Sequence, residues 1–121
     1  MIAICILSVS CTVDYLYYRL VLENDSGHNV SVEWATNTSL EEAFVLSNGS
    51  MVRSELKKYP APCVYWASIT FEDGKVLKYS SEDQGRSLCN PQSYEDGDGI
   101  YTYSFTLTEE DYALAVMPSE E

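Results

Sequence analysis

The sequence is poor in the residues that form metal sites and bind nucleic acids. It contains one histidine, His28, and its four cysteines include no Cys-x-x-Cys pair, so the ligand spacing of a zinc site is absent. Seven lysines and arginines stand against 19 acidic residues, and the net charge of −12 at pH 7 repels phosphate backbones. We therefore expect no metal, no cofactor and no nucleic-acid partner.

The sequence also lacks a recognisable catalytic motif. A hydrolytic site needs a nucleophile with its base, a metal with several ligands, or paired carboxylates in a cleft. His28 lies in a Ser-Gly-His-Asn turn with no nucleophile nearby in sequence, which favours a solvent-exposed turn residue over a general base. We expect a binding or scaffolding module and not an enzyme. A small enzyme that acts on glycans through two of its scattered carboxylates is the alternative.

The first eleven residues form an uncharged apolar run that ends in Leu-Ser-Val-Ser-Cys. This run is too short for a transmembrane helix, which needs about 20 apolar residues. It resembles the signal peptide and lipobox of a bacterial lipoprotein. The resemblance implies that residues 1–10 are a signal peptide, that cleavage occurs before Cys11, and that the thiol of Cys11 carries a lipid. A buried first β-strand is the alternative, because isoleucine, valine and cysteine suit strands.

The remaining chain, residues 11–121, has room for one domain with one core. Apolar and polar residues alternate along most of it, which predicts strands over 14–24, 30–34, 43–46, 51–56, 63–72, 75–80 and 100–107. Thr108 followed by three acidic residues predicts the start of a short helix. We expect an all-β fold, an antiparallel β-sandwich of the Ig-like or transthyretin-like kind, with a short C-terminal helical turn.

Turn residues predict how the strands connect. The turns at 25–28, Asn48-Gly49 and Asp73-Gly74 each predict a β-hairpin, since these residues tolerate the backbone angles of tight turns. Ser81 to Gly99 is polar and rich in turn residues, which predicts one long loop. Such loops often carry function.

The layout as a whole resembles small outer-membrane lipoproteins of Bacteroidetes, whose mature part is one β-sandwich. The matching segments are the lipobox at 7–11, the turn at 46–50, the strand end and turn at 69–75, and the tail at 101–112. The resemblance implies a lipid anchor in the bacterial outer membrane, on either its periplasmic or its surface face. It implies a glycan or an envelope protein as the partner.

Two cysteines remain if Cys5 leaves with the signal peptide and Cys11 is lipidated. These are Cys63 and Cys89, and an oxidising envelope compartment permits a disulfide between them. The bridge would stabilise the fold by roughly 3–4 kcal/mol in the chain-entropy account. Two separate buried thiols are the alternative.

The predicted ligand-binding residues are Tyr94, Asp96 and Asp98, where aromatic, charged and glycine residues coincide in the long loop. The same carboxylates do not form an EF-hand, because the sixth and twelfth positions counted from Asp96 are not glycine and glutamate. Trp34 and Trp66 are candidates for a sugar or peptide groove, although aromatic residues on strands more often belong to the core.

Asparagine usage points to a different class of protein. Four of the five asparagines head an Asn-X-Ser/Thr sequon, namely Asn24, Asn29, Asn37 and Asn48. Taken as glycan acceptors, they suggest a glycosylated eukaryotic secreted binding domain. Taken as turn residues, they reflect the local hydrogen bonding that asparagine and serine provide in β-turns.

Overall fold

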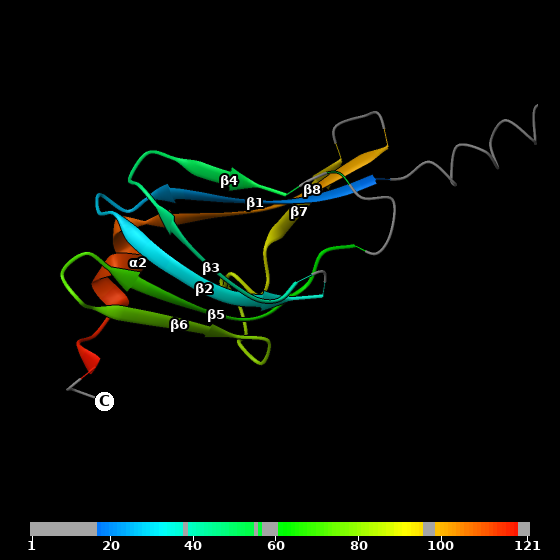
Figure 1. Cartoon of the computed structure of the whole chain (residues 1–121). Helices are drawn as coiled ribbons and strands as arrows, with labels where there is room; N and C mark the ends of the chain where they lie inside the picture. The colour runs from blue at the N-terminus through cyan, green and yellow to red at the C-terminus, as the bar shows by residue number, and fades with distance from the viewer. Residues whose placement is uncertain (1–16, 38, 55, 57–60, 96–98, 119–121) are drawn as a thin grey trace, which may run out of the picture.

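A computed structural model describes residues 17–37, 39–54, 56, 61–95 and 99–118 (Figure 1). In this part the chain forms eight β-strands followed by one short helix. The strands are β1 (Tyr17–Asp25), β2 (Val30–Thr36), β3 (Ser39–Leu46), β4 (Met51–Arg53), β5 (Val64–Phe71), β6 (Val76–Ser80), β7 (Gln92–Glu95) and β8 (Ile100–Thr108). The helix is α2 (Glu109–Leu114), and it is not long enough to cross a membrane.

The strands form two four-stranded sheets that pack face to face (Figure 1). One sheet has the order β4-β1-β8-β7 and the other the order β3-β2-β5-β6. The pairs are antiparallel except β1 and β8, which run parallel along nine residues. The predicted antiparallel β-sandwich is confirmed, with the first and last described strands side by side at the centre of one sheet.

The core lies between the sheets, and the alternating pattern accounts for it. Leu20 and Leu22 of β1 face inward beside Phe105 and Leu107 of β8, and each is at most 6% exposed. Val32, Ile69 and Phe71 cover them from the other sheet. Because successive strand residues point to opposite faces, this register buries the apolar set of each strand at once.

One of the three predicted hairpins is confirmed and two are wrong. β5 and β6 pair across the turn at Asp73-Gly74, where Gly74 has a φ of +97°. β1 and β2 lie in different sheets, and so do β3 and β4, because β4 pairs with β1. Turn residues fix a local reversal of the chain, but they do not fix which sheet the next strand joins.

The predicted loop over 81–99 is wrong in its second half. Gln92–Glu95 forms β7, which pairs antiparallel with the free side of β8. All four β7 residues are exposed, so no alternating pattern marks the strand in the sequence. Leu88, within the same segment, is fully buried and ties it to the core.

Two further strand predictions need correction. β2 continues to Thr36, and β3 begins at Ser39 and not near residue 43, so the predicted loop between them is shorter. In a regular strand over 63–72, Cys63 and Tyr65 would share one face with Phe71, but Phe71 is buried whereas Cys63 is exposed and Tyr65 is 46% exposed. The register shift between Ala35 and Thr36, opposite this end of β5, marks the irregularity that turns these side chains outward.

Helix α2 begins where the sequence predicts. Thr108 caps it: its hydroxyl accepts from the backbone nitrogen of Asp111, whose carboxylate accepts from the backbone nitrogen of Thr108. Arg86 binds the same carboxylate at 2.5 Å and so joins the segment before β7 to the helix. These contacts hold α2 against the end of the sandwich.

Candidate functional site

The sandwich is open along one side, where the edge strands β3 and β4 of the two sheets face each other. A groove of about 600 Å³ lies between them. Its apolar lining includes Leu20, Trp34, Phe44 and Val52, which belong to the core or pack against it. The depression therefore reaches down to the layer of side chains that the sheets share.

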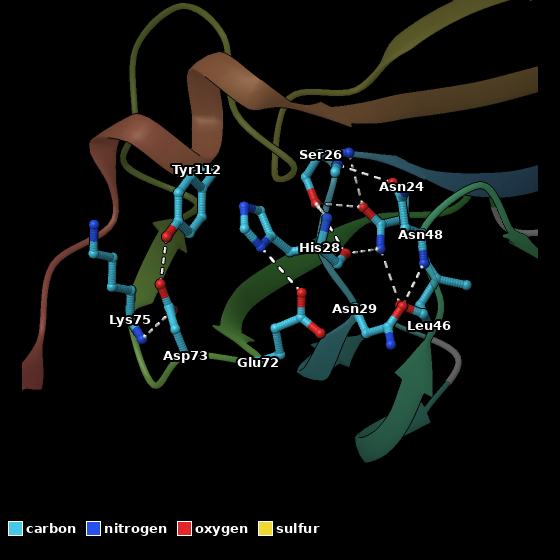
Figure 2. Close-up of polar contacts among 11 residues, drawn as sticks. Asn24, Ser26, His28, Asn29, Leu46, Asn48, Glu72, Asp73, Lys75 and Tyr112 are labelled. Carbon is cyan, nitrogen blue, oxygen red and sulfur yellow. Dashed lines mark hydrogen bonds and ion pairs between the residues drawn. The ribbon is translucent and has the colours of Figure 1, made fainter.

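The two walls of the groove are joined by a turn that Asn24 holds in place. The Asn24 side chain is fully buried, and its Nδ2 donates to the carbonyl oxygens of His28 at 2.8 Å and Leu46 at 3.0 Å (Figure 2). Its backbone donates to the oxygen of Ser50 and accepts from the nitrogen of Gly49. One asparagine on β1 thus fixes both the turn into β2 and the turn from β3 to β4.

Trp34 forms part of the groove floor. Its indole Nε1 donates to Oε1 of Glu42 at 3.0 Å, and its ring meets Phe44 edge to face, with the ring centroids 5.2 Å apart. Only 6% of Trp34 is exposed, so it presents little of its ring to solvent. The charged side chains at the groove are Glu42 on the β3 wall and Arg53 on the β4 wall.

Tyr94, one of the predicted ligand-binding residues, lies in β7 with its side chain 55% exposed. It lines a shallow basin of about 180 Å³ on the outer face of its sheet, together with Arg19 of β1. Met51 and Arg53 line both this basin and the groove, so β4 forms a wall between two adjoining depressions. Asp96 and Asp98, the other two predicted ligand-binding residues, lie outside the described residues.

Cys63 and Cys89 are free thiols in this structure, one exposed and the other half-buried. Burial raises the pKa of Cys89 to about 11. The predicted disulfide is therefore not formed here. Cys11, the predicted lipidation site, lies outside the described residues.

His28 lies at the end of the sandwich, where three elements meet (Figure 2). Its Nδ1 shares a hydrogen bond of 3.1 Å with Oε2 of Glu72, and its ring stacks on Tyr112 of α2 at a centroid distance of 4.0 Å. The Tyr112 hydroxyl donates to Asp73, which holds the pKa of Asp73 below its ordinary value and raises that of Tyr112. The imidazole therefore packs against α2 and is not a freely exposed turn residue.

Among the described residues, no group of three or more His, Cys, Asp or Glu side chains is arranged to hold a metal ion.

The four sequon asparagines form hydrogen bonds within the fold. Nδ2 of Asn37 donates to the oxygen of Ala61, and Asn29 and Asn48 accept from backbone nitrogens with their Oδ1 atoms. A glycan on the fully buried Nδ2 of Asn24 is incompatible with this fold.

The sequence did not single out the groove as a site. Trp34 was the one groove residue considered for binding, and the structure places Trp66 on the other face of its sheet, across from Ser80 of β6 and Ala35 of β2. The two adjacent acids Glu41 and Glu42, next to the apolar run at 43–46, are the sequence feature that could have indicated this site. The predicted β3–β4 hairpin would instead have paired β4 with the edge of β3 that borders the groove. The groove exists because that hairpin does not form.

Comparison with family models, with curated proteins and with solved structures finds no match to this chain.

Proposed function

We propose that this protein is a non-catalytic binding module of the bacterial cell envelope, held at the outer membrane by a lipid on Cys11. We propose that its partner binds in the groove between β3 and β4. The observation that carries the proposal is the groove itself. Among the described residues it has an apolar floor, several serines, and the charged side chains of Glu42 and Arg53. A concave apolar site with a few polar groups is the usual form of a binding site.

The two tryptophans supply a direct test of the binding site. Trp34 lines the groove and Trp66 does not. In an NMR titration of the Cys11→Ala protein with envelope glycan fragments and with short peptides, a binding probe should shift the indole N–H signal of Trp34. The signal of Trp66 should stay in place. A probe that shifts Trp66, or residues 81–91, and leaves Trp34 unchanged would contradict the proposal.

The lipid anchor is tested separately. Expressed in a bacterium from its first residue, the protein should partition into detergent and incorporate labelled palmitate. Cys11→Ala should abolish both, while the circular dichroism of the sandwich stays the same. Label retained by the Cys11→Ala protein would show that the anchor lies elsewhere.

The disulfide belongs to the same proposal, since an oxidising envelope permits a bridge between Cys63 and Cys89. We expect protein from the periplasm to yield no titratable thiol from Cys63 and Cys89 in denaturant, and the reduced protein to yield both. Their Cα atoms must then lie within about 7 Å of each other. Two free thiols in periplasmic protein would rule the bridge out.

A further inference from the structure

Among the described residues, β3 is the longest edge strand of the two sheets. It has eight residues and pairs on one side with β2. The other edges are short or partly covered. β4 has three residues, β7 has four, and the edge of β6 is bridged at Val76 by Val116 near the C-terminus. Because an edge strand turns every second backbone N–H and C=O away from its sheet, β3 offers hydrogen bonds to an added strand.

The groove lies directly beside this edge. Phe44 and Leu46 of β3 line it from one wall, and Val52 of β4 from the other. A strand added along β3 would turn alternate side chains to the groove and the others to solvent. The apolar floor would then receive the inward set, which is how strand addition combines backbone affinity with side-chain selectivity.

Charge indicates what kind of segment fits. β3 carries two adjacent exposed acids, Glu41 and Glu42, and no basic residue. The whole chain has a net charge of −12, so its field attracts basic segments and repels acidic ones. A second copy pairing through β3 would add two more acids to the same edge, and it carries the same net charge of −12, so electrostatic repulsion opposes self-pairing.

A glycan fits the same surface less well. Sugar rings stack on exposed aromatic faces, but Trp34 is 6% exposed and its indole N–H is already bonded to Glu42. Phe44 packs edge to face against that indole. The groove therefore offers apolar depth and a backbone edge, and not a stacking platform.

We propose that the partner of this domain is an extended polypeptide segment with alternating apolar and basic residues, which adds to β3 as an edge strand and places its apolar side chains in the groove. This rests on the proposed function and names its partner class. The acids of β3 select against a second copy and against acidic segments, while the apolar floor selects for alternation.

The test uses three synthetic peptides as long as β3, with eight residues each. One alternates valine and lysine, one alternates valine and glutamate, and one has the composition of the first with its valines in a block. Titrated into labelled Cys11→Ala protein, the first should shift the β3 amides and Trp34 and slow β3 hydrogen exchange. The other two should bind at least about tenfold more weakly, a difference of about 1.4 kcal/mol.

Charge reversal supplies the matched variants. Glu41→Lys should weaken the valine–lysine peptide about tenfold or more and strengthen the valine–glutamate peptide, whereas Glu82→Lys, an exposed acid just past the end of β6, should change neither. Equal binding of all three peptides, or equal effects of the two variants, would overturn the proposal.

The remaining outcomes separate the two claims. A glycan that shifts Trp34 while no peptide does leaves the binding site standing and overturns strand addition. Chemical-shift changes in β3 that depend on protein concentration alone identify a second copy as the occupant of the groove. They overturn strand addition by a peptide as well. Peptide binding that maps away from β3 and β4 overturns both the site and the partner.

Discussion

At the scale of single residues, this fold depends on polar side chains that hold several backbone groups at once. Asn24 is the clearest case, because its buried amide serves two turns that leave different strands. The sequence presents the same residue as the head of a sequon, and only its surroundings decide between the two roles. A buried amide with all its groups bonded is structural, since a glycan there would expose the core.

We predict that Asn24→Ala lowers the free energy of unfolding by about 2–3 kcal/mol, because the carbonyl oxygens of His28 and Leu46 each lose the amide donor and the Ser26 backbone nitrogen loses its acceptor. Urea denaturation measures the change. Asn90→Ala is the matched control and should cost less than about 1 kcal/mol, since Asn90 is exposed and the carbonyl oxygens of Asp83 and Gly85 that it binds can accept from water instead. Equal losses for the two variants would contradict the role given to Asn24.

Tyr112 and Asp73 give a prediction that depends on pH. The Tyr112 hydroxyl and the backbone nitrogen of Lys75 bind the ionised Asp73 carboxylate and lower its pKa from 3.8. The contribution to stability is therefore present above that value and is lost as the pH falls through the lowered pKa of the folded state. In Tyr112→Phe the pKa of Asp73 should return toward 3.8, as followed by NMR of its carboxyl carbon. A pKa that does not move would show that the hydroxyl has no such role, and Tyr94→Phe is the control.

At the scale of elements, the alternating pattern predicted where single strands lie in the sequence. It did not predict which strands pair with each other. Strands β1, β5 and β8 and the start of α2 follow from residues close in sequence, such as Leu20 and Leu22 or Thr108 and Asp111. β7 was missed because Gln92–Glu95 has no apolar face and owes its conformation to pairing with β8. The sheet to which β2 or β4 belongs depends on long-range packing, which no turn residue encodes.

The same reason explains why the groove was not predicted. Its residues are separated by up to 34 positions, from Leu20 to Ser54, and they meet only because β4 pairs with β1. The predicted hairpin at Asn48-Gly49 would have placed β4 beside β3 and buried that edge. Tyr94 was predicted as a ligand-binding residue of a long loop, but its neighbours on β1 and β4 come from the sheet order and not from its own segment.

The capping box of α2 yields a prediction at this scale. Asp111 is 4% exposed and accepts from Arg86, from the backbone of Thr108 and from its hydroxyl. Asp111→Ala should lower the free energy of unfolding by about 2–3 kcal/mol, because it removes the Asp111 half of the capping box and takes the acceptor from both the Thr108 backbone nitrogen and Arg86. Glu110→Ala, an exposed change in the same turn, should cost about 0.5 kcal/mol or less. Thermal unfolding of the two variants measures the difference, and a smaller loss for Asp111→Ala would contradict this account of the helix.

At the scale of the whole molecule, two features of different origin combine in the proposed function. The proposed lipid anchor on Cys11 rests on the sequence and concerns where the protein would reside, while the groove follows from the fold and concerns what the protein would bind. A tether of few residues between Cys11 and β1 would keep the sandwich close to the membrane. We therefore expect a partner that is present at the same membrane surface.

The most direct test of the central claim is site-specific photo-crosslinking of the lipidated protein in living bacteria. A photoreactive amino acid is placed at Val45, which is 73% exposed on the rim of the groove, and in a second strain at Glu82, just past the end of β6. The account predicts a discrete membrane-associated crosslinked product from position 45, lost with Glu41→Lys, and none from position 82. Products from position 82 and none from position 45 would contradict it.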